Sequence, residues 1–233
     1  MHWSRQRLVM LQKQVRRGFC SSASRPSDRG LYELRVYDVQ PHLYTRFLAL
    51  TNQKIHLRTA HSQLIGYWSV EYGALNQVFH IWRYESYSQR TAVRASLAQD
   101  ADWTEQYISK AIPMLTKQNN EVGRLLWGLQ PPPKEGGVFE LQRFHVKPEG
   151  RRLGWGGLRD YIQSHHAPGL SQVVGAFCND VGHNHTVQVL WWFQSPDYWA
   201  ETRDQRETAG PTVEHLDPVS NKLMFPLPFS PMK

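Results

Sequence analysis

The sequence lacks long apolar runs, and it holds only two cysteines, Cys20 and Cys178, in 233 residues. A membrane-spanning helix needs about 18 consecutive apolar residues, so no span is predicted. A disulfide-rich secreted scaffold needs several cysteine pairs and is excluded as well, which fits a reducing compartment. Acidic residues are absent from residues 1–25, although the whole chain has 20 of them. These absences indicate a globular chain that begins with an unusual segment.

The first thirty residues carry almost all of the net positive charge. Seven Lys or Arg stand there against one acid, Asp28, whereas the rest of the chain has 20 basic and 19 acidic residues. Because the rest of the chain shows no basic surface of the kind that nucleic acids require, no nucleic-acid partner is predicted. A start that is rich in Arg and Ser and free of acids is typical of a mitochondrial transit peptide. We expect residues 1–29 to be this peptide and the matrix to be the destination; a cytosolic protein with a basic arm is the alternative.

The chain after residue 30 contains an internal repeat. Tyr32-Glu33-Leu34-Arg35 recurs as Phe139-Glu140-Leu141-Gln142 at an offset of 107, and Ile81-Trp82 recurs as Leu190-Trp191 at an offset of 109. A period of this length is too long for a solenoid and fits a duplicated domain. We therefore predict three segments after the transit peptide: a first domain at 30–130, a Pro- and Gly-rich linker at 131–137, and a second domain at 138–233.

Each copy shows the same order of predicted elements. Residues 31–38 alternate like a strand, and residues 44–55 carry apolar side chains at helical spacing. Two apolar runs around a turn at 72–76 predict a hairpin. Ser86 with Gln89 predicts the cap of a second helix, and residues 121–127 predict a closing strand. The fold class is therefore α+β, with tandem ferredoxin-like (βαββαβ) repeats.

The central strands are apolar on both faces. Phe79 and Ile81 point to one side of their strand, and Val78 and Trp82 point to the other. Helices cover only one face of a ferredoxin-like sheet, so the other face needs a large apolar partner. The second copy can supply this partner. We therefore predict that the two sheets pack face to face and form a dimeric α/β barrel within one chain.

Long strings of this sequence resemble the NipSnap family, from about residue 30 to the end. They include Tyr32–Arg35, His56–Ser62, Leu64–Gly73, Val78–Trp82 and Phe229–Lys233, and they are most similar to the third vertebrate NipSnap subgroup. The resemblance implies tandem ferredoxin-like domains, mitochondrial association and no established enzymatic activity. Members of other subgroups resemble protein-binding factors, including surface markers that recruit the autophagy machinery to damaged mitochondria. The second copy departs from this pattern, since it has Ser164–Gly169 in place of the His56–Ser62 string.

Four residues are candidates for ligand binding: His56, Arg58, His61 and His165. His56 and His165 align at the end of the first helix of each copy, where a neutral imidazole could act as a base, bind haem or ligate a metal. The helix dipole alone also stabilises a histidine at this place, and this structural interpretation is favoured. His56, Arg58 and His61 form a basic cluster, which with Arg35 and Arg83 could hold a small anion.

No residue pattern identifies a metal site, a nucleotide site or a catalytic set. His183-Asn184-His185 offers too few ligands for a metal. Gly154-Trp155-Gly156-Gly157 lacks the rest of a dinucleotide fingerprint, and no Ser–His–Asp order or carboxylate pair stands out. No catalytic residue, cofactor or metal is therefore predicted. We expect a non-enzymatic mitochondrial protein that binds other proteins as an adaptor in mitochondrial homeostasis; a small anionic ligand and peripheral membrane association stay open.

Two alternative functions also stay open, because dimeric α/β barrels include enzymes. One is a cofactor-free or haem-dependent enzyme such as a monooxygenase, and the other is a carrier of a small ligand. A wet, polar cavity with His56 or His165 pointing into it would favour the enzyme, whereas the carrier needs a cavity but no catalytic pair. A cavity filled by Trp and Tyr side chains would favour the protein-binding role.

The leader is expected to be removed on import. Arg17-Gly18-Phe19 followed by Cys20 resembles a matrix-protease site, so the mature N-terminus should fall between Phe19 and Gly30. N-terminal sequencing of protein purified from isolated mitochondria checks this. Recovery of the full-length chain from the matrix would contradict it.

Overall fold

The computed structural model describes residues 29–147, 155–208 and 215–233. The predictions on the transit peptide, on Cys20 and on Gly154 lie outside these residues. The first copy consists of β1 (Leu31–Val39), η1 (Pro41–Leu43), α2 (Tyr44–Thr59), β2 (Gln63–Tyr72), β3 (Gln77–Tyr84), α3 (Tyr87–Gln99), α4 (Ala101–Trp103), η2 (Thr104–Ile108), α5 (Ser109–Ala111), η3 (Ile112–Met114) and β4 (Leu115–Trp127). The second copy consists of β5 (Val138–Val146), α7 (Gly156–Ser164), β6 (Ser171–Val181), β7 (Thr186–Phe193), α8 (Pro196–Thr208) and β8 (Leu216–Pro226).

Local sequence signals account for the boundaries of several elements. Pro41 opens the turn before α2, and the Ser86 side chain accepts a hydrogen bond from the Gln89 backbone N–H at the start of α3. The last strand of the first copy begins at Leu115, earlier than the predicted 121–127. Its first half is polar and exposed and pairs with β1 through the backbone, so apolar patterning does not reveal it.

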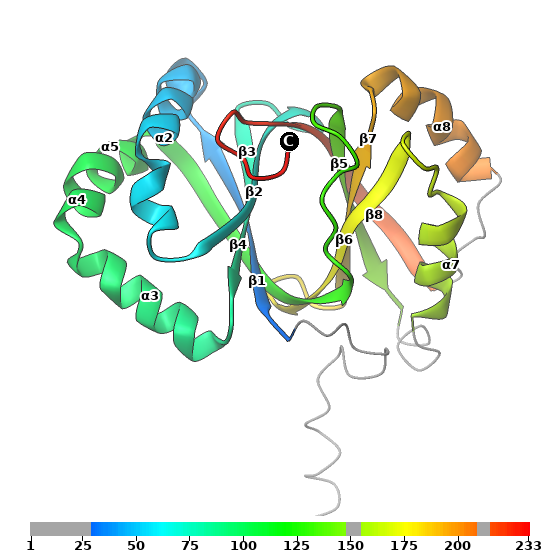
Figure 1. The fold of residues 1–233 in the computed structure, drawn as a ribbon, viewed down its shortest axis with the longest axis horizontal. Helices are drawn as coiled ribbons and strands as arrows, with labels where there is room; N and C mark the ends of the chain where they lie inside the picture. Colours follow the sequence, from blue (N-terminus) through cyan, green and yellow to red (C-terminus); the bar gives the residue numbers. More distant parts are fainter. Residues whose placement is uncertain (1–28, 148–154, 209–214) are drawn as a thin grey trace, which may run out of the picture.

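The eight strands form one closed barrel in the order β1-β3-β2-β8-β5-β7-β6-β4, with antiparallel pairing throughout (Figure 1). Each copy supplies four neighbouring strands. The copies meet at two seams, where β2 pairs with β8 and β4 pairs with β6. Closure gives every described strand a partner on both sides, which removes the exposed sheet edges that promote aggregation. The helices lie outside the barrel, those of the first copy on one side and those of the second on the other.

The barrel interior and the two helical layers hold separate apolar cores. The interior is filled by large side chains from both copies, including Trp68, Phe79, Phe139, Phe177 and Trp192. The opposite faces of the same strands pack under helices, with Val78 and Trp82 in the first copy and Val187 and Trp191 in the second. The predicted face-to-face packing within one chain is therefore confirmed.

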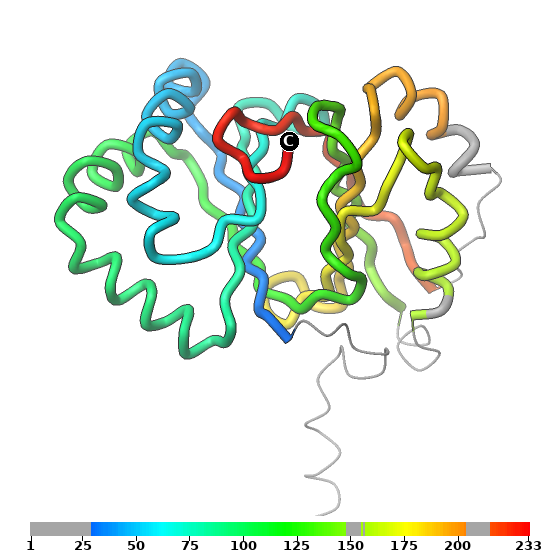
Figure 2. The backbone as a smooth tube through the Cα atoms, viewed as in Figure 1, coloured from blue at the N-terminus to red at the C-terminus, as the bar shows by residue number. Residues whose placement is uncertain are grey.

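Two connections fasten the copies to each other. The linker lies against the second copy, where Gly136 accepts a hydrogen bond from the Trp192 indole at 2.7 Å. Gly137 has a φ of +84°, and a Cβ there would lie 2.3 Å from the Phe193 carbonyl oxygen, so the position requires glycine. After β8 the chain turns back along β2 (Figure 2), where the backbone N–H of Tyr67 donates to the Ser230 hydroxyl at 2.9 Å.

Removal of one interior side chain should weaken both copies together. Trp68 is fully buried, and its ring centroid lies 5.3 Å from that of Phe139 in the other copy. We expect Trp68→Ala to lower the free energy of unfolding by about 3–5 kcal/mol in a single cooperative transition. Urea denaturation followed by circular dichroism measures this. Tyr72→Ala, on the same strand but exposed, is the control and should change stability by less than about 0.5 kcal/mol. Two separate transitions, with only the first one shifted, would contradict a shared core.

Candidate functional site

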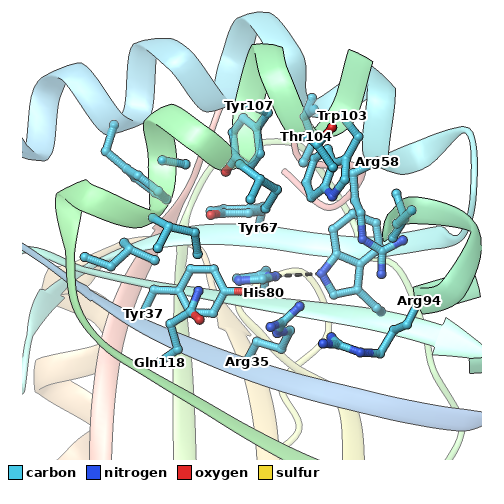
Figure 3. A pocket seen from close by; sticks show the side chains of 18 of the residues that line it. Arg35, Tyr37, Arg58, Tyr67, His80, Arg94, Trp103, Thr104, Tyr107 and Gln118 are labelled. Carbon is cyan, nitrogen blue, oxygen red and sulfur yellow. Dashed lines mark hydrogen bonds between the residues drawn. The ribbon is translucent and has the colours of Figure 1, made fainter. Parts of the chain in front are cut away.

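A cavity of about 390 Å³ lies outside the barrel, between the sheet of the first copy and its helices (Figure 3). Its floor comes from the outward face of β1, β2 and β3, with Arg35, Tyr37, Tyr67, His80 and Trp82. Its walls and roof come from the helical layer, with Phe47, Ile55, Arg58, Arg94, Leu97, Trp103 and Tyr107 among them. None of its lining residues, all in the described part of the chain, is Asp or Glu. The cavity therefore combines aromatic walls with an excess of positive charge.

Part of the roof of this cavity comes from a stretch that is longer in the first copy than in the second. Strand pairing places the two copies at an offset of 109 in their third strands and 101 in their fourth strands. The first copy therefore has eight more residues between these strands. The short turns α4, η2 and α5 occupy this stretch and place Trp103, Thr104 and Tyr107 over the sheet. This longer stretch thus completes the cavity over the sheet and the two helices α2 and α3.

His80 lies in the floor of the cavity, packed against aromatic rings. The Tyr67 ring stacks on it with centroids 4.5 Å apart, and the Tyr37 ring meets it edge-on at 4.7 Å. The Trp82 indole Nε1–H donates to His80 Nδ1 at 2.6 Å. An indole nitrogen can only donate, so Nδ1 is the acceptor and the proton of the neutral ring is assigned to Nε2. His80 therefore presents an N–H donor, and not a base, through its remaining nitrogen.

Three buried donors in the floor make no hydrogen bond within the described residues: Arg35 Nε, the Tyr67 hydroxyl and His80 Nε2. Arg35 Nε lies 4.0 Å from a Glu33 carboxylate oxygen, which leaves Tyr67 and His80 as the two neutral donors. Both side chains are almost inaccessible, with Tyr67 2% and His80 3% exposed. Burial, followed by the charges of Arg35 and Arg58, lowers the pKa of His80 well below 6.5, and burial raises the pKa of Tyr67 well above 10. Both groups are thus neutral donors near neutral pH. An unpaired buried donor costs about 1–3 kcal/mol, so the pair is suited to an acceptor on a ligand.

Arginine side chains supply the charge of the cavity. Arg58 is buried, its guanidinium lies 4.3 Å from the centroid of the Trp82 ring, and it donates to the Tyr84 hydroxyl at 2.7 Å. Arg35 comes from β1, and Arg94 is more exposed, on α3. Three cations around a cavity without a lining carboxylate favour an anionic ligand.

The carboxylate of Glu33 lies next to the cavity and bonds to the residues around its arginines. Glu33 accepts hydrogen bonds from Arg90 at 2.5 Å, Asn120 at 2.8 Å and the Tyr84 hydroxyl at 3.2 Å. Burial raises the pKa of Glu33, but Arg35, Arg90 and Asn120 together outweigh it and lower the pKa from 4.5 to about 2. Glu33 is therefore ionised and fully bonded, and it serves the architecture of the cavity rather than its chemistry.

The four residues predicted from the sequence lie in different places. Arg58 lines the cavity, and so does Arg35 of the predicted basic cluster, whereas His56 is exposed on α2. His61 Nε2 lies 2.8 Å from an Asp100 carboxylate oxygen, which ties the end of α2 to the start of α4. The structure thus brings two arginines of the cluster to one site and leaves its histidines outside.

The aligned histidine of the second copy is not part of this site. His165 Nδ1 lies 2.6 Å from the Tyr161 carbonyl oxygen, at the end of α7. This contact is the helix-end arrangement that the structural interpretation describes. His56 and His165 belong to separate helical layers, so the structure does not bring them together.

Sequence reasoning named Arg35 but missed Tyr67 and His80 in the floor, although the repeat contained a signal for them. Strand pairing matches three polar residues of the first copy to less polar ones in the second: Arg35 to Gln142, Tyr67 to Ala176 and His80 to Val189. A polar side chain in only one of two duplicated cores would have marked the cavity. Their proximity could not be read directly, because they come from three different strands.

A second cavity of about 350 Å³ lies at one end of the barrel and is lined by Arg143, His183 and Lys222 among others. Glu121 offsets part of the positive charge there, because it pairs with Arg143 at 2.9 Å. Glu121 also lies 2.6 Å from His183 Nδ1 and accepts a hydrogen bond from Gln188 at 2.6 Å. These contacts join β4 to the second copy. Within the described ranges, no group of three His, Cys, Asp or Glu side chains is placed to hold a metal, and no helix is both long and apolar enough to cross a membrane.

Fold and site together define a class: a dimeric α/β barrel fused into one chain, with a ligand-sized cavity in its first copy. Solved structures share this fold. A proposed monooxygenase from Fusobacterium nucleatum matches with a TM-score of 0.63 over 89% of this chain and 100% of its own, at 9% identity. An anthrone oxidase-like protein matches with a TM-score of 0.59 over 88% of this chain and 93% of its own, at 10% identity. At these identities the likeness shows the fold alone.

The sequence identifies the family within this class. The NIPSNAP family model matches residues 32–126 and 139–231, one match in each copy. Human protein NipSnap homolog 3A is 40% identical over 227 residues, which cover 92% of this chain and 92% of that protein. Mouse protein NipSnap homolog 3B is 38% identical over 223 residues, which cover 91% and 90%. The chain belongs to the NIPSNAP family, in its third subgroup, as its sequence strings predicted.

The buried His80 should make stability depend on pH. Its pKa is lowered in the folded state, so below about 6.5 the unfolded chain binds one more proton than the folded one. Stability should therefore fall as the pH drops below about 6.5, by up to about 1.4 kcal/mol per pH unit from this group. Urea unfolding across this range should give a shallower pH slope for His80→Gln. An unchanged slope would contradict a neutral His80.

Proposed function

We propose that this NipSnap-type protein binds a small organic anion in the cavity of its first copy, inside mitochondria. The observation that carries the proposal is the pair of unpaired buried donors, Tyr67 and His80, in a cavity that arginines surround. A ligand that accepts both hydrogen bonds and carries negative charge would offset the cost of burying these donors. The apolar side chains of the roof would cover the rest of the ligand.

The cavity suits binding better than acid–base catalysis. His80 cannot accept a proton at Nδ1 without losing the hydrogen bond from Trp82, and its pKa is lowered. None of the lining residues in the described chain is a carboxylate that could act as a base. We therefore favour a ligand-binding protein over the monooxygenase-type enzyme that the fold would permit.

One ligand per chain is expected. The second copy has Gln142, Ala176 and Val189 at the positions of Arg35, Tyr67 and His80. Of the residues first suggested by the sequence, Arg58 is proposed to contribute charge directly. His61 is proposed to position the end of α2 through Asp100.

Binding can be tested by thermal shift measurements with aliphatic and aromatic carboxylates, phenols and inorganic phosphate. A ligand that binds the folded state raises the melting temperature, and above its Kd the increase grows with the logarithm of the ligand concentration. We expect at least one organic anion to stabilise the protein and its neutral amide or ether analogue to have little effect. Arg35→Gln, which installs the residue of the second copy, should remove the stabilisation.

The matched control is Arg46→Gln, which removes the same charge from an exposed position of α2. It should keep the response to the ligand. Equal losses in the two variants would indicate a general charge effect. Stabilisation by neutral analogues alone would overturn the proposal of an anion site.

A second candidate is the adaptor role in mitochondrial homeostasis. It is favoured by the barrel interior, which aromatic and aliphatic side chains fill apart from the cavity at one end. It is also favoured by exposed apolar side chains around the β2–β3 turn, where Tyr72 and Leu75 are 59% and 75% exposed. Such residues suit a docking surface for another protein.

The adaptor role can be tested separately from the cavity. Affinity purification from mitochondria with reciprocal capture should identify a partner that is lost with Leu75→Ser and kept with Arg35→Gln. If Arg35→Gln abolishes capture of the partner instead, the partner depends on the cavity and not on the β2–β3 turn. Failure of reciprocal capture would count against the adaptor role.

A further inference from the structure

The deepest donors of the cavity indicate what kind of oxygen the ligand carries. Tyr67 offers a single O–H and His80 a single N–H, on stacked rings whose centroids are 4.5 Å apart. We propose that the ligand is a planar phenol or enol and that it is bound as its oxyanion, with the charged oxygen accepting from Tyr67 and His80. This inference rests on the proposed function, since it requires the cavity to bind a small organic anion.

The donor geometry favours one oxygen atom over a carboxylate or phosphate group. Those groups are usually recognised by an arginine fork that makes two parallel hydrogen bonds. Here the fork of Arg58 is already engaged, because its two terminal nitrogens donate to Ser62 and to Tyr84 and its plane faces Trp82. The Arg35 guanidinium lies 5.0 Å from the centroid of the Tyr37 ring, and its Nε lies 4.0 Å from Glu33, so part of this second fork also faces protein groups. Two single donors match the lone pairs of one phenolate or enolate oxygen.

The walls of the cavity favour a flat ligand. Tyr37 and Trp82 lie on the sheet side, and Trp103 and Tyr107 lie in the roof, with the last two rings stacked at 4.7 Å (Figure 3). Aromatic side chains pack well against the face or edge of another planar group. A planar conjugated body also spreads the charge of its oxyanion, which lowers the cost of placing that charge in a partly apolar cavity.

The charges around the cavity favour the ionised form of such a ligand. Arg35, Arg58 and Arg94 line it. The nearby Glu33 is bonded to Arg90 and lies 4.0 Å from Arg35 Nε, so this one carboxylate offsets only part of the positive charge. Positive charges and donated hydrogen bonds stabilise an oxyanion and not the neutral acid. On ionisation the ligand O–H bond breaks, the electron pair stays on the oxygen, and the proton leaves to water, since His80 Nδ1 already accepts from Trp82.

The probe for this inference is 4-nitrophenol, whose phenolate absorbs visible light and whose phenol does not. Absorbance titration of the full chain with bound probe should give an apparent pKa at least about one unit below that of the free probe, which corresponds to a tenfold preference for phenolate. 4-Nitroanisole, which cannot ionise, should bind at least about tenfold more weakly than 4-nitrophenol.

Two phenylalanine substitutions compare the loss of a hydroxyl that is free to bond the ligand with the loss of a hydroxyl that is already bonded within the protein. Tyr67→Phe removes an unpaired donor, whereas Tyr107→Phe removes a hydroxyl of the same cavity that already bonds to Thr51 at 3.0 Å. Tyr67→Phe should weaken phenolate binding roughly tenfold and reduce the pKa shift of the probe. Tyr107→Phe should leave that shift in place. Melting temperatures of both variants report that they fold.

The possible failures are distinguishable. A bound probe that titrates like the free one, or equal effects of the two substitutions, would overturn the oxyanion inference and leave an anion site intact. Tight binding of 4-nitrobenzoate without any response to Tyr67→Phe would also overturn it, in favour of a carboxylate held by the arginines. If phenols, carboxylates and phosphate all fail to bind, the proposed function fails together with this inference.

Discussion

The inner face of each four-stranded sheet carries large apolar side chains, and the rest of the architecture depends on covering that face. Trp68 and Phe79 of the first copy meet Phe139 and Trp192 of the second in one buried core. The helices cover only the outer face of each sheet, so the apolar inner face needs a second sheet to shield it from solvent. Fusion of the two copies provides the cover within one molecule, and pairing at both seams closes the barrel.

Closure of the barrel leaves the outer faces free to diverge. Some buried polar contacts are the same in both copies: Asn120 donates to Glu33 at 2.8 Å, and Asn221 donates to Glu140 at 3.0 Å at the matching positions. These contacts have a structural role, because both outer layers need them. The residues that differ line the cavity of the first copy, which separates the candidate site from the scaffold.

Trp82 and Trp191 occupy matching positions in the two copies, and their buried indole N–H groups find different acceptors. In the second copy, the Trp191 indole donates to the Gln142 side chain at 2.9 Å. In the first copy, Arg35 replaces that glutamine and has no acceptor to offer. The Trp82 indole donates to His80 instead, and this contact fixes the proton of the histidine on Nε2. The N–H donor that His80 presents in the floor therefore depends on Trp82.

The sequence by itself determined the duplication, the two-faced strands, the family and the charged leader. These properties are local or periodic, so they can be read from spacing and from the comparison of the copies. The repeat offset also placed Trp82 and Trp191 in equivalent positions, where the structure buries both.

Only the tertiary structure decided where the cavity lies and which groups line it. Arg35 and His80 are far apart in the sequence and become neighbours because β1 pairs with β3, while Tyr67 joins them from β2. Part of the roof depends on how the longer stretch of the first copy folds back over the sheet, and the tautomer of His80 depends on one hydrogen bond from Trp82. Long-range contacts and hydrogen-bond direction set these features, and neither leaves a periodic pattern in the sequence.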